Sequence, residues 1–488
     1  MNFYIVRKTL GWIVLFEGLF MLIPLITSIV YWESEFLVFL ACMLICAGIG
    51  FLLTRGNSKK DTIFAKEGLV IVALSWIIMS LFGALPFIIS GVIPNFVDAF
   101  FETVSGFTTT GSSILSSEQI EAMPKCIAIW RSFTHWIGGM GVLVFIMAFL
   151  PLSGARNMYI MKAESPGPTV GKLVPKVRLT AKILYTIYFL MTLTEFVLLL
   201  FGKVSPFEAL NIAFSTAGTG GFAIRGDSMA STSAYIQVLV AIFMILFSIN
   251  FNAYYFIARG RFKEAFFSEV KVFIAIVLLA IAGITLNLCL TGTQGYSVGE
   301  AIRHSLFTVS SLISTTGYVT VNYDLWPVFS KAIIIIIMFV GACAGSTGGG
   351  IKVSRIILLF KNSKREVGKL VHPNQVKSVM MDKKPVEEDT IRSILAFMVL
   401  YIVIFFISFL VVSIDVDSLE SAFSAIAATI NNVGPGLGMA GPTESFAFFS
   451  PLSKLVMCFD MLAGRLELFP MLALFNPYVW KRERVKKQ

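Results

Sequence analysis

Long apolar runs, separated by short polar loops, dominate the chain from end to end. A helix of about 20 residues crosses a bilayer core of roughly 30 Å. Ten apolar runs suit that length and carry few charges. We predict ten transmembrane helices, over residues 10–31, 36–54, 69–90, 128–152, 183–201, 234–257, 272–290, 332–360, 394–414 and 455–480. Because the number is even, both termini should lie on the same side of the membrane.

The distribution of lysine and arginine orients these spans. Positive charge is retained in cytoplasmic loops. With the N-terminus inside, the cytoplasmic loops and termini hold 31 of the 39 Lys and Arg residues. We therefore predict a multi-pass membrane protein with both termini in the cytoplasm. The net charge of +10 is then mainly a result of topology. We expect the positive charges to attract anionic membrane lipid, and we do not expect nucleic acid as a partner.

Composition agrees with a membrane protein and excludes several other classes. Hydrophobic residues make up 56% of the chain and charged residues 14%, whereas soluble domains carry roughly 25% charge. The N-terminus runs into the first span without a credible cleavage site, so we expect that helix to be kept. The six cysteines lie mostly in apolar stretches and suggest small core residues, and the three histidines are too dispersed for a metal cluster. We predict no enzyme activity and no cofactor.

A unit repeats four times after the first two spans. It contains a full span, a shorter segment that cannot cross, a Gly-containing turn and a second full span. The short segments occupy residues 96–113, 207–222, 299–318 and 419–436. They begin near Asp98, Glu208, Glu300 and Glu420 and lead to Gly111, Gly221, Gly317 and Gly434. We divide the chain into two extra N-terminal helices (1–60) and four repeats (61–155, 156–262, 263–362 and 363–488), the last with a cytosolic linker and a basic C-terminus.

Non-helical backbone at membrane depth persists only where protein or a water-filled cavity satisfies its polar groups. A short helix followed by a Gly turn therefore indicates a re-entrant pore loop. The C-terminal end of such a helix is partly negative and favours a cation, and glycine lets carbonyl groups point inward to replace the ion's water. One such loop alone is equally well explained as a surface turn after an amphipathic helix. Four in matching positions favour an all-α protein with four fused helix–pore loop–helix repeats around one pore.

At these turns the sequence resembles a known family. The motifs are "TTTGSS" at 108–113, "STAGTGGF" at 215–222, "STTGY" at 314–318 and "NNVGPGLG" at 431–438. Further matches are "RSFTHWIGGMG" at 131–141, "AESPGP" at 163–168 and "GACAGSTGGGIKVSR" at 341–355. Together they resemble the Trk/Ktr/HKT superfamily of potassium transporters over essentially the whole chain. The extra N-terminal pair of spans is similar to the TrkH branch.

This resemblance implies potassium uptake across the bacterial plasma membrane through a selectivity filter. It also implies a homodimer with one pore in each protomer, and a cytosolic nucleotide-binding regulatory ring of the TrkA type. The potassium-binding residues implied are Thr109, Thr110, Gly111, Thr219, Gly220, Gly221, Thr315, Thr316, Gly317, Asn432, Val433 and Gly434. In the second repeat Gly218, Gly220 and Gly221 all offer the turn, and we choose Gly221 because Phe222 then matches Tyr318. No loop has a full Thr-Val-Gly-Tyr-Gly motif, so we expect a shorter and less selective ring than in dedicated potassium channels.

Two further features concern a gate. Three adjacent glycines cost a helix roughly 1 kcal/mol each relative to alanine, so a continuous helix is not expected at 344–350. The resemblance implies a gating loop made of Ala344, Gly345, Ser346, Thr347, Gly348, Gly349 and Gly350. The alternative is a small-residue helix-packing face that includes Gly341. Arg465 resembles the family's pore-facing arginine below the filter, although a salt bridge to Asp460 or Glu467 is an alternative. Arg131 is predicted to be structural.

Other functions remain open at this point. A transporter of another fold usually has one pair of broken helices, whereas four loops favour a pore. A membrane enzyme would need a nucleophile with a base or a metal cluster, and the spans contain neither arrangement. Sodium uptake is the main alternative for the ion. In plant relatives, serine in place of the first filter glycine accompanies sodium permeation, and this chain keeps Gly111. A sodium- or proton-coupled cation symporter of the same fold is also compatible with the sequence.

Overall fold

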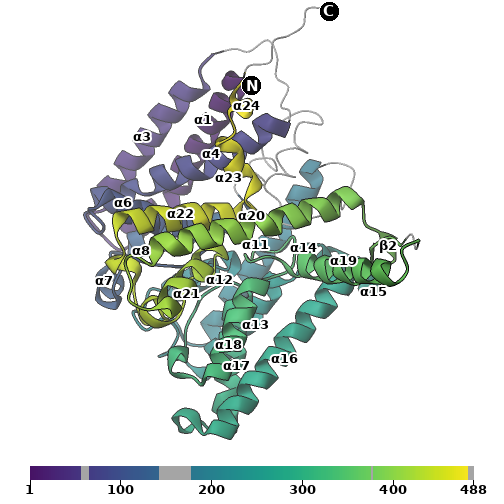
Figure 1. The fold of residues 1–488 in the computed structure, drawn as a ribbon. Coiled ribbons are helices and arrows are strands. Elements are labelled where there is room, and N and C mark those ends of the chain that lie inside the picture. The colour runs from purple at the N-terminus through teal and green to yellow at the C-terminus, as the bar shows by residue number, and fades with distance from the viewer. Residues whose placement is uncertain (57–64, 142–176, 375–376, 482–488) are drawn as a thin grey trace, which may run out of the picture.

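The structure is a computed structural model that describes residues 1–56, 65–141, 177–374 and 377–481, and these are mainly helical (Figure 1). The chain begins with α1 (Phe3–Phe20), α2 (Leu22–Val30), α3 (Phe36–Thr54), α4 (Ala65–Gly83) and α5 (Leu85–Ile89). The side chain of Asn2 accepts a hydrogen bond from the Ile5 amide and so caps α1. Helices α3 and α4 both pack against α1, which makes one N-terminal group of helices.

Within the described residues, six helical stretches are long and apolar enough to cross a membrane. They are Phe3–Val30, Phe36–Thr54, Ala65–Ile89, Leu179–Phe201, Ser268–Thr291 and Glu388–Val412. A bent pair, α13 (Ala234–Ser248) with α14 (Phe251–Ala258), makes a seventh if it is taken as one span. The chain is therefore a multi-pass membrane protein. The total of ten spans stays a prediction, because the end of span 128–152 and the loop after it lie largely outside the described residues.

The four short segments predicted from the sequence each contain a helix that is too short to cross. These helices are α6 (Phe96–Phe107), α12 (Pro206–Gly218), α17 (Val298–Ile313) and α21 (Leu419–Ile430). At 1.5 Å per residue even α17, with 16 residues, falls short of a bilayer core of about 30 Å. Asp98, Glu208, Glu300 and Glu420 each lie in the first turn of one of these helices, where the helix dipole favours a carboxylate. The short segments predicted from the sequence are therefore helical.

Longer helices surround these four. Helix α8 (Lys125–Gly139) contacts both α6 and α12, while α13 and α16 (Ser268–Thr291) pack on α17. Helices α20 (Glu388–Val412) and α22 (Pro451–Arg465) pack on α21. The remaining helices are α7 (Ser117–Ala122), α11 (Val177–Phe201), α15 (Phe262–Ala265), α18 (Val328–Val340), α19 (Val353–Val371), α23 (Phe469–Leu474) and α24 (Pro477–Trp480). Short 3₁₀ turns occur at Thr293–Gly295, Tyr323–Leu325, Gly438–Ala440 and Phe446–Phe448.

The prediction of one continuous helix over residues 234–257 was wrong. The chain bends by 92° between α13 and α14, at Ile249 and Asn250. Asn250 caps the new helix by accepting from the Asn252 amide at 2.9 Å. The Phe251 amide donates to the Gly345 carbonyl at 3.0 Å, so the freed backbone group is satisfied by another segment.

Spans 10–31 and 455–480 were also predicted as single helices. The first is one span, which starts earlier, at Phe3, and runs to Val30 with a local irregularity at Met21, because Pro24 lacks an amide proton and crowds the carbonyl four residues before it. The last span stops at Arg465, and α23 begins only at Phe469. Glu467 and Leu468, which lie between them, have φ values of 59° and 66°, outside the helical region.

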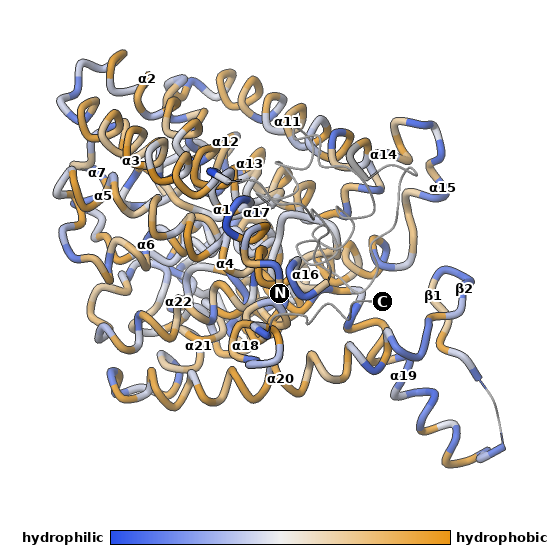
Figure 2. The backbone as a smooth tube through the Cα atoms, turned by 90° about the horizontal axis from the view of Figure 1, so that it is seen from above, coloured by the Kyte–Doolittle hydropathy of each residue, from blue (hydrophilic) through white to orange (hydrophobic). Residues whose placement is uncertain are grey.

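One part of the molecule extends beyond the apolar body. Helix α19 and the hairpin of β1 (Met380–Met381) and β2 (Lys384–Pro385) project from it and are largely hydrophilic (Figure 2). This is the segment that the charge count assigned to the cytoplasm. The six cysteines are all free, and five are buried as predicted, but Cys289 is exposed on α16, so its prediction as a core residue was wrong.

Candidate functional site

The four short helices lead into four turns that share one backbone conformation. We call residues 108–113, 218–223, 314–319 and 431–436 loops 1 to 4. In each loop the second residue has a positive φ; these residues are Thr109 (57°), Thr219 (55°), Thr315 (61°) and Asn432 (55°). Two residues later each has a glycine with positive φ, namely Gly111 (86°), Gly221 (76°), Gly317 (85°) and Gly434 (100°). The conformation of this later position suits glycine, because it has no Cβ.

The same hydrogen bond closes each loop onto its helix. The amides of Thr110, Gly220, Thr316 and Val433 donate to the carbonyls of Ser105, Ser215, Ser311 and Ala428 at 2.8–2.9 Å. The second loop therefore has the register chosen from the sequence, with Thr219, Gly220 and Gly221 equivalent in backbone shape to Thr315, Thr316 and Gly317.

The loops form a closed ring. A Cβ built on Gly111 would lie 2.1 Å from the Gly220 carbonyl oxygen, and one on Gly221 would lie 2.0 Å from that of Thr316. A Cβ on Gly317 would lie 2.4 Å from the Val433 oxygen, and one on Gly434 2.8 Å from the Thr110 oxygen. Each loop thus presents a carbonyl to the glycine of another loop, in the order 1, 2, 3, 4 and back to 1. Any side chain at these glycines would displace the ring.

Two buried oxygens beside the ring have no hydrogen-bond partner among the residues that the structure describes. They are Thr109 Oγ1 and Asn432 Oδ1, and both residues are fully buried. An unpaired buried oxygen costs free energy unless a ligand or water satisfies it. Hydroxyl, amide and carbonyl oxygens are suitable ligands for a hard cation, so the chemistry of this ring fits a cation rather than an anion.

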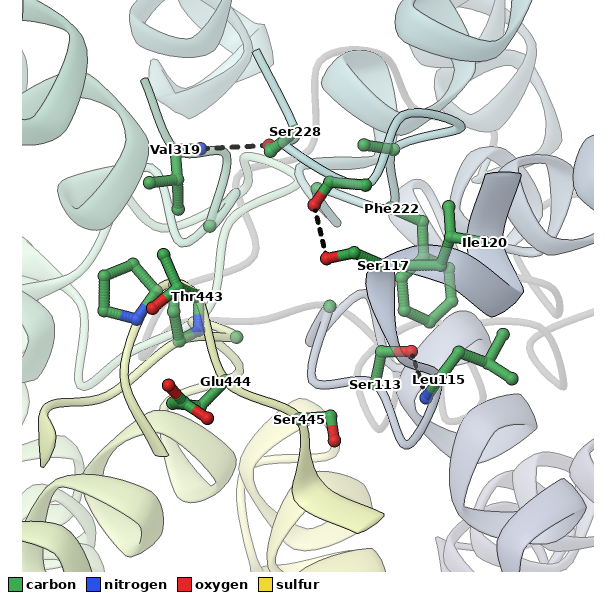
Figure 3. A pocket seen from close by; sticks show the side chains of 18 of the residues that line it. Ser113, Leu115, Ser117, Ile120, Phe222, Ser228, Val319, Thr443, Glu444 and Ser445 are labelled. Carbon is green, nitrogen blue, oxygen red and sulfur yellow. Dashed lines mark hydrogen bonds between the residues drawn. The ribbon is translucent and has the colours of Figure 1, made fainter. Parts of the chain in front are cut away.

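An open cavity of about 460 Å³ leads to one side of the ring. Its lining includes all four loop glycines, and it is rich in serine (Figure 3). Ser113 of loop 1 and Ser117 of α7 lie across the cavity from Thr443 and Glu444, which precede α22 (Figure 3). The hydroxyls and the Glu444 carboxylate make this entrance compatible with a hydrated cation.

The opposite side of the ring is covered by a non-helical segment, residues 341–352, between α18 and α19. The Gly349 amide donates to Thr315 Oγ1 at 2.6 Å, and the Gly350 amide donates to the Asn431 carbonyl at 3.0 Å. The segment therefore touches loops 3 and 4 directly. Gly341 and Gly345 have φ values of 67° and 68°, so the alternative of a helical packing face was wrong.

Buried charged residues hold both ends of this segment. Glu269, in the first turn of α16, accepts from the amides of Ala344 at 2.7 Å and Ser354 at 3.1 Å. Lys352 donates to the Gly348 carbonyl. Because one carboxylate holds both flanks of the segment, its conformation depends on α16 as well as on its own glycines.

Arg465 links the 341–352 segment to α8. Its Nη1 donates to the Thr347 carbonyl at 2.7 Å, and its Nη2 donates to the carbonyls of Gly138 and Gly139 at 2.6 Å each. The carboxylates considered as its partners are engaged elsewhere. Glu467 pairs with Arg355, and Asp460 accepts from Ser408 at 2.8 Å.

Two side chains hold the ring from α8: Arg131, which was predicted to be structural, and His135, whose role the sequence reasoning missed. Arg131 Nε donates to Glu102 Oε1 at 2.6 Å, and its Nη1 donates to the Ala223 carbonyl at 2.9 Å. His135 lies one turn further along the same helix, with Nδ1 2.7 Å from the Gly106 carbonyl oxygen. The sequence contained one indication of these contacts: Arg131 and His135 are four residues apart and therefore lie on the same face of an apolar helix.

A multi-pass membrane protein with a closed ring of backbone carbonyls between an entrance cavity and a covering segment belongs to the class of cation transport proteins. A family model described as TrkH, cation transport protein, matches residues 34–481. The chain belongs to the TrkH family. This confirms the resemblance inferred from the motifs, and membership of a transporter family agrees with the predictions that the chain is not an enzyme and needs no cofactor.

The chain is similar to several curated proteins over nearly its whole length. It is 34% identical over 489 residues to the Trk system potassium uptake protein TrkH of Salmonella typhimurium, covering 99% of this chain and 100% of the relative. It is 33% identical over 486 residues to the Trk system potassium uptake protein TrkG of Escherichia coli strain K12, covering 98% of each. The crystal structure of the potassium transporter TrkH from Vibrio parahaemolyticus matches with a TM-score of 0.87 and 30% identity, covering 99% of this chain and 100% of that one.

Proposed function

We propose that this chain takes up potassium across the bacterial plasma membrane through a selectivity filter formed by loops 1 to 4. The observation that carries the proposal is the closed ring of carbonyl groups around glycines that leave no room for a side chain. Such a ring can replace the hydration shell of a potassium ion. The names of the relatives, which are potassium uptake proteins, support potassium over sodium.

In this proposal the residues with positive φ and the carbonyls between them bind the ion. The filter consists of Thr109, Thr110, Gly111, Thr219, Gly220, Gly221, Thr315, Thr316, Gly317, Asn432, Val433 and Gly434. The segment 344–350 acts as the gate together with Arg465. Its contacts with Thr315 and Asn431 support this role, because a segment in that position blocks passage from the ring.

The wider organisation is also part of the proposal. Ten spans form four fused repeats around the pore, with two extra N-terminal helices and both termini in the cytoplasm. The protein works as a homodimer and binds a cytosolic nucleotide-binding ring of the TrkA type. The hydrophilic α19 and hairpin support a cytosolic partner, because they offer charged surface outside the apolar body (Figure 2).

Tracer uptake into proteoliposomes tests the proposed function. The purified protein should take up rubidium, potassium should compete strongly, and sodium and lithium should compete weakly. Equal competition by sodium would overturn the potassium assignment. The alternative, a sodium- or proton-coupled symporter, is tested in the same vesicles: uptake that stops when the sodium or proton gradient is abolished, while the potassium gradient is kept, would favour coupling over passive flux.

Replacing Gly111 by serine should weaken the preference for potassium. The new Cβ would lie 2.1 Å from the Gly220 oxygen, so the carbonyl ring must shift, and φ at this position is 86°. The potassium-to-sodium ratio of uptake measures the effect. Gly91→Ser is the matched control, because Gly91 also has positive φ, of 76°, but has no atom within 4 Å of a built Cβ. An unchanged ratio in a well-folded Gly111→Ser protein would remove Gly111 from the filter.

A further inference from the structure

Loop 2 lacks a side-chain contact that loops 1 and 3 possess. In loop 1 the hydroxyls of Thr108 and Thr110 are 2.8 Å apart, and in loop 3 those of Ser314 and Thr316 are 2.6 Å apart. Each hydroxyl pair joins the end of the short helix to the residue that precedes the ring glycine. The equivalent positions in loop 2 are Gly218 and Gly220, which have no side chains. Loop 4 has Asn431 and Val433 there and also lacks a hydroxyl pair, but Asn431 accepts from the Tyr401 hydroxyl at 2.9 Å. In loop 2 neither Gly218 nor Gly220 can make a side-chain contact of this kind.

The side chain of His135 fills the space at this position. A Cβ built on Gly220 would lie 2.2 Å from both Cγ and Nδ1 of the His135 ring. A Cβ on Gly218 would lie 2.2 Å from the His135 carbonyl oxygen. The histidine is fully buried, and its ring centroid lies 4.2 Å from that of Phe222. Both glycines of loop 2 are thus required by the close approach of α8, and the imidazole lies where loops 1 and 3 carry a threonine side chain.

The imidazole also makes hydrogen bonds on both sides. Its Nδ1 lies 2.7 Å from the Gly106 carbonyl oxygen in α6, and the Phe222 amide lies 3.3 Å from its Nε2. Because a carbonyl only accepts and an amide N–H only donates, the partners select the neutral form with the proton on Nδ1. The ring therefore joins the first short helix to the residue that directly follows Gly221.

We propose that His135 is a positioning residue for the filter: it holds loop 2 from α8 in place of the missing hydroxyl pair, and so sets the preference of the pore for potassium over sodium. The inference rests on the proposed function. The hydroxyl pairs of loops 1 and 3 are local, whereas the support for loop 2 comes from the helix that follows loop 1. A carbonyl ring discriminates between ions by the position and number of its dipoles, so loss of this support acts on selectivity before it acts on folding.

A set of four variants tests this role. His135→Ala should lower the potassium-to-sodium uptake ratio by about tenfold, the factor that the net free energy of one hydrogen bond supplies. His135→Gln keeps a donor and an acceptor and should retain most of the ratio. The double variant His135→Ala with Gly220→Thr fills the space of the imidazole with the threonine of loops 1 and 3, but Gly218 offers it no hydroxyl partner. It should therefore stay as unselective as His135→Ala, because the hydrogen bonds of the imidazole are not replaced. His304→Ala, at the other buried histidine of the described residues, is the matched control.

The readouts are the uptake ratio in proteoliposomes and the thermal stability of each purified variant. A wild-type ratio in His135→Ala, or an equal fall in His304→Ala, would overturn the positioning role. If His135→Ala does not fold, the double variant decides: a double variant that folds with the wild-type ratio overturns the positioning role, because packing without the imidazole hydrogen bonds is then sufficient. The wild-type protein separates this question from the proposed function, since a wild type without potassium preference would refute the filter itself.

Discussion

Glu102→Ala should severely destabilise the protein, by roughly 3–5 kcal/mol, because it leaves the guanidinium of Arg131 buried without its carboxylate. Arg131 is only 4% exposed and Glu102 is fully buried. The carboxylate also accepts from the Ser113 hydroxyl at 2.9 Å and from the Ile114 amide at 3.0 Å. Removing it therefore strands one charge and two donors behind loop 1. The measurement is thermal unfolding of the purified variant in detergent.

A second ion pair supplies the control for this prediction. Glu208 and Arg225 are 2.7 Å apart, and Arg225 is 38% exposed. The hydrogen bond to Glu208 raises the pKa of Arg225, so the pair is formed, but water can solvate the arginine once its partner is gone. Glu208→Ala should cost no more than about 1 kcal/mol, as is typical of exposed pairs. Equal unfolding temperatures for Glu102→Ala and Glu208→Ala would contradict the expected difference between the buried and the exposed ion pair.

The combined variant Glu102→Leu with Arg131→Met tests whether the stranded guanidinium causes the loss of stability. Replacing both members of a buried ion pair by apolar residues is often close to neutral, whereas removing one member is not. The double variant should therefore recover part of the stability that Glu102→Ala loses. Recovery will be incomplete, because the Ser113 hydroxyl and the Ile114 amide still lose their acceptor. A double variant less stable than Glu102→Ala would show that the ion pair is not the source of the loss.

The short helices and their turns could be predicted because the determinants are local. A carboxylate in the first turn, an apolar stretch and a turn glycine occur within one segment, as in residues 96–113. The breaks in the long helices could not be predicted in this way. Residues 234–257 are mainly apolar and carry no charge, and the bend at Asn250 is stabilised by the Gly345 carbonyl, 95 positions away in sequence. The hydropathy of a segment does not show that a hydrogen-bond partner from another part of the chain will satisfy its backbone.

The same distinction between local and distant determinants applies to the residues of the site. The ring glycines were predictable, because positive φ restricts the residue type at the turn itself. The contacts of Arg131 and His135 could not be predicted. Both residues lie on α8, which follows loop 1, whereas their partners Ala223 and Phe222 belong to loop 2. In the sequence, loop 2 differs from loops 1 and 3 by two glycines without visible cause. The cause is steric and comes from α8, which approaches Gly218 and Gly220 too closely for any Cβ.

Arg465→Ala should increase ion flux strongly while leaving the protein folded. The guanidinium touches the covering segment at Thr347 and the end of α8 at Gly138 and Gly139, so it holds the proposed gate against the opposite wall. It also places a positive charge beneath the ring. At about 5 Å and an effective dielectric constant of about 20, this charge repels a monovalent cation by roughly 3 kcal/mol. Its removal should raise rubidium uptake by about tenfold to a hundredfold.

The acceptors of Arg465 among the described residues favour a small change in stability. These acceptors are backbone carbonyls, which lose less when a donor is removed than a buried carboxylate that is left without its cation. Rubidium uptake per folded protein, under a fixed gradient, should rise in both Arg465→Ala and Arg465→Gln. Arg392→Ala removes the same charge from an arginine whose side chain is 80% exposed, and should leave uptake unchanged. Normal stability with wild-type uptake in both Arg465 variants would mean that the arginine holds the segment without limiting the passage of ions.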